Sequence, residues 1–174
     1  MKKCSILVAV LLCFGLVVAC ASIPNGIKPV SNFDLNKYLG EWYEIARFDF
    51  AHEKDMDNVT ARYSLNKDGS VRVENRGYDY KKGKWKESIG KAKFVGSSSV
   101  GELKVSFFGP FYSGYNVIKI DPDYNHVLVV GENYNYLWIL SRTKTIPEEV
   151  KKDYVDFAKS LGFDMNKLVW TKQL

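Results

Sequence analysis

The stretch NVTARYSL, residues 58–65, decides the fold class of this chain. Apolar and polar side chains alternate along it, which is typical of a β-strand with one buried and one solvated face. The turn sequence KDG, residues 67–69, follows it and leads into a second run of the same kind at residues 71–78. Two such runs joined by a short glycine-containing turn predict two neighbouring antiparallel strands.

Strand-like runs of similar length continue on both sides of this pair. They are separated by turn residues and cover residues 40–50, 84–95, 102–108, 115–120, 126–131 and 136–142. Eight short strands in this spacing predict an antiparallel sandwich or barrel. A barrel of about eight strands has an interior that side chains fill or that holds one small ligand.

The last two runs predict a helix packed against the outside of the sheet. Residues 127–130, VLVV, and 137–140, LWIL, are apolar on both faces, so their outer face needs a cover. Residues 147–161 begin with Pro-Glu-Glu and carry apolar side chains at helical spacing, up to Gly162. We therefore predict an all-β fold: an eight-stranded up-and-down antiparallel barrel with one C-terminal α-helix packed outside and a short final strand at residues 168–170.

The composition fits one globular domain and argues against several kinds of site. Of the 174 residues, 46% are hydrophobic and 26% are charged. Three cysteines and two histidines are too few for a disulfide scaffold or a histidine-rich metal site. No glycine-rich loop of the phosphate-binding kind is present in the sequence. We predict no metal and no cofactor.

The N-terminal sequence has the layout of a cleaved export signal. Lys2 and Lys3 precede an apolar run at residues 6–18, and small residues lead to Cys20. The run is shorter than the ~20 apolar residues of a membrane-spanning helix. Without residues 1–19, 23 basic and 20 acidic residues remain, a net charge of +3 that is too weak to indicate nucleic-acid binding.

The four residues VVAC, 17–20, resemble the lipobox of bacterial lipoproteins. The resemblance implies that Cys20 carries a diacylglycerol thioether and an N-terminal acyl chain, and two or more chains anchor a protein stably. Ala21, rather than aspartate, follows the cysteine, which by the same resemblance implies the outer membrane, facing the periplasm. An ordinary secreted protein with an incidental cysteine stays as the alternative. We predict a signal over residues 1–19, a lipidated N-terminus and tether over 20–32, and one domain over 33–174.

Three motifs, in order along the chain, resemble those of the lipocalins. LGEWY, residues 39–43, resembles the Gly-x-Trp motif of the first strand, DPDY, residues 121–124, the second motif, and WILSR, residues 138–142, the third. The stretches WYEIARF, VSFFGPFY and YLWILSRT, which begin at residues 42, 105 and 136, are similar to the bacterial branch. The resemblance implies a lipocalin barrel in which Gly40 and Trp42 lie at the closed end, with Arg142 across the tryptophan ring.

The resemblance and the alternation together predict a lipid-binding cavity. Small side chains on the expected inner face, Ala61, Gly77, Gly90 and Ala92, favour an empty interior over a filled one. The candidate cavity-lining residues are Tyr63, Val73, Asn75, Phe94, Val105, Phe107 and Tyr115. Each of them also fits ordinary core packing. The basic residues Arg62, Arg72, Arg76, Lys91 and Lys93 fit a solvated outer face better than an anion site.

We therefore predict a membrane-anchored protein, not an enzyme, that binds fatty acids, lysophospholipids or similar amphiphiles for transport, storage or envelope maintenance. A lipid-modifying enzyme that hydrolyses lysophospholipids on the same barrel is one alternative. A structural envelope protein with a filled barrel is another. The aromatic stretch FGPFY, residues 108–112, favours a membrane contact or a homodimer interface if it is exposed.

Overall fold

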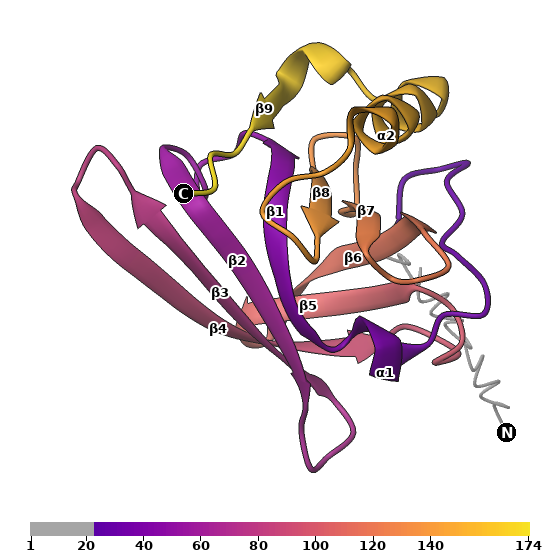
Figure 1. Ribbon diagram of the computed structural model, residues 1–174. Helices are drawn as coiled ribbons and strands as arrows, with labels where there is room; N and C mark the ends of the chain where they lie inside the picture. The colour runs from indigo at the N-terminus through magenta and orange to yellow at the C-terminus, as the bar shows by residue number, and fades with distance from the viewer. Residues whose placement is uncertain (1–22) are drawn as a thin grey trace, which may run out of the picture.

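A computed structural model describes residues 23–174 as a closed antiparallel barrel with a helix on its outside (Figure 1). The predicted signal over residues 1–19 and Cys20 lie outside the described residues. The eight barrel strands are β1 (Gly40–Phe48), β2 (Met56–Leu65), β3 (Val71–Asp79), β4 (Lys84–Phe94), β5 (Glu102–Phe108), β6 (Phe111–Ile120), β7 (His126–Val130) and β8 (Leu137–Ser141). The remaining elements are α1 (Leu35–Tyr38), α2 (Glu148–Ser160), the 3-10 helix η1 (Met165–Lys167) and β9 (Leu168–Trp170). The predicted fold class is confirmed.

Strand β1 closes the barrel by pairing with strands on both of its edges. One edge pairs with β8 from Tyr43 to Arg47, and the other pairs with β2 from Gly40 to Tyr43. Beyond that point β9 replaces β2 and pairs with Ala46–Phe48 of β1. The short final strand thus lies beside the part of β1 from which β2 has separated.

Two apolar cores explain why β7 and β8 are apolar on both faces. One core lies inside the barrel around Trp42, and the other lies between the barrel and α2. Tyr154 and Ala158 of α2 are buried in the outer core, together with Leu128 and Ile139 of the covered strands. The helix predicted over residues 147–161 therefore provides the expected cover.

Several strand boundaries differ by one to four residues from those that the sequence predicts. Strand β6 begins at Phe111 rather than at residue 115, because Gly109 and Pro110 form a tight turn directly after β5. Strand β2 begins two residues early, at Met56. The four-residue helix α1 was not predicted; the Asp34 side chain caps it by accepting a hydrogen bond from the Asn36 amide at 2.9 Å.

The described part of the predicted tether runs along the outside of the barrel. Ile27 is buried in the outer core, and the Val30 amide donates to the Val117 carbonyl at 2.8 Å. Ser31 forms a β-bridge with Val100. Residues 27–31 are therefore held on the barrel surface. In the described residues we find no helix that is long and apolar enough to cross a membrane.

Candidate functional site

One end of the barrel is closed by Trp42 and Arg142. The guanidinium carbon of Arg142 lies 3.9 Å from the centre of the fully buried Trp42 ring. Arg142 also donates to the carbonyls of Lys37 and Glu41, each at 2.7 Å, and to that of Leu39 at 2.9 Å. These carbonyls belong to α1 and to the residues that follow it, so one side chain holds the helix across the barrel end.

Gly40 makes this close approach feasible. Its φ angle is +100°, which side-chain-bearing residues rarely adopt, and an added Cβ would lie 3.3 Å from an Arg142 nitrogen. The indole N–H of Trp42 donates to the Tyr38 carbonyl at 2.8 Å. The closed end is therefore rigid and fully paired at the positions that carry the sequence motifs.

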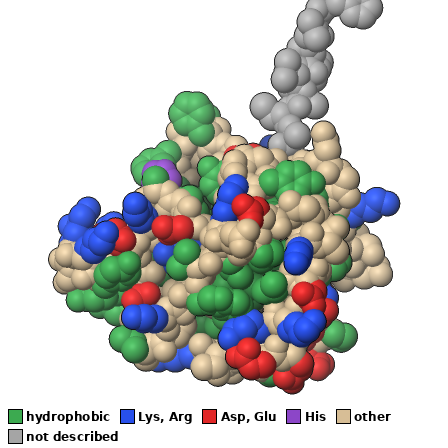
Figure 2. Space-filling model, turned by 90° about the horizontal axis from the view of Figure 1, so that it is seen from above, with side chains coloured by type: hydrophobic (Ala, Val, Ile, Leu, Met, Phe, Trp, Pro, Cys, Tyr) green, Lys and Arg blue, Asp and Glu red, His purple; other side chains and the backbone are tan. Residues whose placement is uncertain are grey.

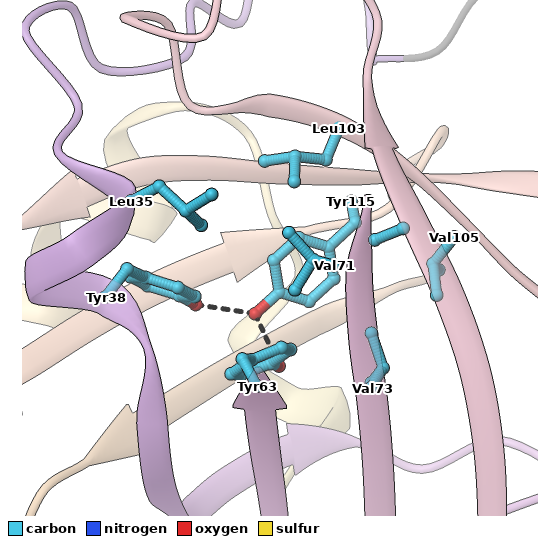
Figure 3. Close-up of a pocket in the computed structure, with 9 residues that line it drawn as sticks. Leu35, Tyr38, Tyr63, Val71, Val73, Leu103, Val105 and Tyr115 are labelled. Carbon is cyan, nitrogen blue, oxygen red and sulfur yellow. Dashed lines mark hydrogen bonds between the residues drawn. The ribbon is translucent and has the colours of Figure 1, made fainter. Parts of the chain in front are cut away.

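Three tyrosine side chains form a floor above this closed end (Figure 3): Tyr38 of α1, Tyr63 of β2 and Tyr115 of β6. The Tyr115 hydroxyl hydrogen-bonds to that of Tyr38 at 2.6 Å and to that of Tyr63 at 2.7 Å. Burial raises the pKa of Tyr38 and Tyr115 well above the usual value, so these hydroxyls stay neutral. A small space of about 10 Å³, lined by these rings and by aliphatic side chains, has room for about one water.

A cavity of about 550 Å³ lies beyond the tyrosine floor and reaches the other end of the barrel. This volume falls within the ~300–1,000 Å³ that small-ligand pockets occupy. Six of the seven predicted lining residues border it: Tyr63, Val73, Asn75, Val105, Phe107 and Tyr115. Of the small side chains, Ala61 and Gly77 border it too, and Ala92 borders the small space below.

Phe94 has a different place, and it lines neither cavity. Its ring packs edge-on against Phe33 with the ring centres 6.1 Å apart, and both rings belong to the inner core. The reason is its position at the last residue of β4, next to the closed end. Gly90, on the same strand, makes room for the Phe107 ring, which an added Cβ would approach to 2.9 Å.

The cavity wall also carries acidic groups that sequence reasoning missed. Buried Glu44 of β1 forms an ion pair with buried Arg47 at 2.7 Å. The carboxyl of Glu53, from the loop between β1 and β2, accepts a hydrogen bond from the Trp138 indole at 2.9 Å. Burial, together with the nearby Glu44 carboxyl, raises the pKa of Glu53 to about 8. Glu53 is therefore mostly a neutral acid at pH 7.

A signal for Glu44 was present in the sequence, because it shares the inner-face alternation of Trp42 two residues earlier. Glu53 had no such signal, since a loop delivers it to the wall. Asn75 adds a further polar feature: its side-chain oxygen is buried on the cavity wall, and no group in residues 23–174 donates to it. A ligand with a hydroxyl or amine would supply the missing donor.

The five basic residues expected on the solvated outer face, Arg62, Arg72, Arg76, Lys91 and Lys93, lie mainly outside the cavity. Only Arg76 borders it, and its guanidinium stacks on the Trp85 ring at 4.0 Å. Arg72 pairs with Glu74 at 3.3 Å, and Lys91 pairs with Asp68 at 3.0 Å. The described residues hold no group of three His, Cys, Asp or Glu side chains that suits a metal ion.

Comparison with known proteins places this geometry in a family. Residues 33–173 match the family model described as a lipocalin-like domain. The chain is 54% identical to "Outer membrane lipoprotein Blc" of Citrobacter freundii over 160 residues, which cover 91% of this chain and 90% of the relative. It is 47% identical to the protein of the same name from Vibrio cholerae, with 94% and 96% covered.

A solved structure supports the fold. The cockroach allergen Per a 4 superposes with a TM-score of 0.69 at 20% identity, over 88% of this chain and 96% of the allergen. At this identity the likeness concerns the fold alone. The family match and the bacterial relatives go further, because they cover nearly the whole barrel together with its closed-end motifs. The chain belongs to the lipocalin family.

Proposed function

We propose that this protein binds a single-chain amphiphile, a fatty acid or a lysophospholipid, with the acyl chain in the 550 Å³ cavity. The observation that carries the proposal is a largely apolar cavity that is closed by the tyrosine floor at one end and open at the other. Each buried methylene contributes ~0.8 kcal/mol, so about a dozen contribute ~10 kcal/mol before the costs of association.

The polar groups of the wall suit the other end of such a ligand. The unpaired Asn75 oxygen provides an acceptor on the cavity wall, and the hydroxyls of Thr60 and Ser88, which also border the cavity, can donate or accept. The hydroxyl of a lysophospholipid glycerol, or that of a protonated fatty acid, can donate to the Asn75 oxygen. Transport, storage and envelope maintenance are all compatible with this mode of binding.

We further propose that the protein is an outer membrane lipoprotein anchored through acylated Cys20. The lipobox-like sequence supports this location, as do the names of the bacterial relatives. Radiolabelled palmitate that is incorporated into the wild type and not into a Cys20→Ser variant would support the anchor. Equal labelling of both proteins would contradict it.

The binding proposal is tested with delipidated, signal-free Cys20→Ser protein and a fluorescent fatty acid. Ser88 borders the cavity, whereas Ile89, the next residue on β4, points outward and is 56% exposed. Ser88→Trp fills the cavity, and we expect it to weaken binding at least tenfold. The control Ile89→Trp leaves the affinity unchanged.

Two outcomes would overturn the proposal. One is wild-type protein that takes up no amphiphile, and the other is an equal loss in both variants. Mass spectrometry of the lipid that co-purifies with wild type then distinguishes a fatty acid from a lysophospholipid.

A further inference from the structure

Two neighbouring hairpins at the open end of the barrel carry exposed aromatic side chains. The tip of β5–β6 presents Phe108 and Phe111, each 79% exposed. The tip of β3–β4 presents Tyr80 and Trp85, which are also exposed. Phe108 and Phe111 also border the cavity mouth. Exposed aromatic side chains grouped around a cavity mouth indicate a contact surface.

The β3–β4 hairpin adds positive charge to this end. Within Asp79–Lys86 the sequence has four lysines and one aspartate. Lys81 pairs with Asp55 at 3.1 Å and Lys86 with Asp79 at 2.8 Å, whereas Lys84 forms no ion pair within residues 23–174. Seen from above, basic side chains gather beside hydrophobic ones on the side to which this hairpin extends (Figures 1 and 2). Aromatic rings together with lysines suit an anionic lipid surface.

Asn25, near the start of the described residues, lies on the outside of the barrel beside a loop of the open end. Tyr134, in the open-end loop between β7 and β8, donates to the Asn25 carbonyl at 3.2 Å. From there the segment runs along the outside of the barrel to Ser31, which bridges to Val100 at the closed end. Cys20 precedes Asn25 by five residues, which span at most ~17 Å when extended. A lipid on Cys20 therefore attaches within reach of the open end.

We infer that the open end of the barrel docks on an anionic lipid bilayer. Phe108 and Phe111 enter the interface between headgroups and acyl chains, and the β3–β4 lysines contact the headgroups. The cavity mouth then faces the membrane, and an amphiphile passes between bilayer and cavity with little contact with water. This inference rests on the proposed function only for the cargo, because docking can be measured without a ligand.

The test uses mature protein from residue 20 onward with Cys20→Ser, so that docking is measured without the anchor. Co-sedimentation compares vesicles of phosphatidylethanolamine with about one quarter phosphatidylglycerol against vesicles of phosphatidylcholine. Wild type is expected to bind the anionic vesicles. The double variant Phe108→Ser/Phe111→Ser is expected to lower the partition coefficient at least fivefold. The matched control is Leu65→Ser, because Leu65 is 55% exposed at the closed end.

A variant that lacks two lysines tests whether positive charge on the β3–β4 hairpin contributes to vesicle binding. Lys82→Gln/Lys84→Gln should lower binding to anionic vesicles several-fold, and ~0.5 M salt should abolish the difference from wild type. Its control, Lys67→Gln/Lys93→Gln, removes two exposed lysines near the closed end and should change nothing. The fatty-acid affinity of Lys82→Gln/Lys84→Gln, measured without vesicles, stays at the wild-type value.

Three outcomes would overturn the inference: wild type that stays in the supernatant, an equal loss in Leu65→Ser, or light scattering that shows the phenylalanines holding two copies together in place of vesicle binding. Failure of docking is separate from failure of the proposed function. A wild-type protein that binds fatty acid in solution yet ignores vesicles keeps the function and loses the docking surface.

Discussion

The two ends of the barrel differ in how their aromatic side chains are buried and paired. At the closed end, Trp42 is buried, and Arg142 donates to several carbonyls while covering its ring. At the open end, the Arg76 guanidinium likewise lies over the ring of Trp85, but there both side chains are exposed. The same pair of residue types thus stabilises the fold at one end and lies on a contact surface at the other. Burial, rather than the pairing itself, makes the difference.

The largest expected effect is the difference in the free energy of unfolding between variants that lack Trp42 and variants that lack Trp85. Trp42→Ala removes a fully buried ring and should lower the free energy of unfolding by about 3–5 kcal/mol. Trp85→Ala removes an exposed ring and should cost about 1 kcal/mol or less. Urea unfolding of both variants measures the contrast, and equal losses would show that the two ends do not differ as described.

The Glu53 carboxyl predicts a pH dependence that originates near the open end. Its pKa is raised to about 8, so between about pH 4.5 and 8 the folded protein keeps a proton that the unfolded chain has released. Stability should therefore fall as pH rises through this window, by up to ~1.4 kcal/mol per pH unit from this group. Burial also raises the pKa of Glu44, which adds a contribution of the same sign.

Glu53→Gln keeps an acceptor for the Trp138 indole and removes the titration. Urea unfolding between pH 5 and 8 should give a flatter profile for this variant than for wild type. Glu87→Gln, an exposed residue at the same end, is the control and should keep the wild-type profile. A wild-type stability that rises with pH across this window would contradict the assignment.

Asn75 gives the smallest expected effect, on ligand selectivity. Asn75→Leu removes the unpaired buried oxygen, so the ligand-free protein should gain about 1 kcal/mol of stability. Affinity for a monoacylglycerol, which has hydroxyl donors, should fall about tenfold, whereas affinity for the fatty-acid methyl ester should hold. Competition against a fluorescent fatty acid measures both ligands, and equal losses would rule out a hydrogen bond at Asn75.

Much of the closed end could be predicted from the sequence. Alternation located the eight strands, and the motif residues Gly40, Trp42 and Arg142 meet in the structure. Helix α1 escaped prediction because four residues are too few for a periodic pattern, and only its cap, Asp34, gives a local signal.

The lining of the cavity was harder to predict. Alternation of apolar and polar residues shows which face of a strand a side chain lies on, but not how far along the barrel axis it lies. Phe94 has the predicted inward face but lies at the level of the closed end, against Phe33. Glu53 comes from a loop, whose residues follow no period, so its approach to Trp138 depends on the tertiary fold. The residues that sequence reasoning missed or misplaced thus include side chains on strands, such as Glu44 and Phe94, as well as Glu53 from a loop.

The central claim, that an amphiphile occupies the cavity from the open end, is tested most directly by NMR with a spin-labelled stearic acid. Amides of cavity-lining residues such as Ser88, Ser113 and Gly114 should broaden on addition of about one equivalent. The amides of Gly40 and Asn66 at the closed end should stay sharp. Broadening confined to α2 and the outer core, or none at all, would contradict the account.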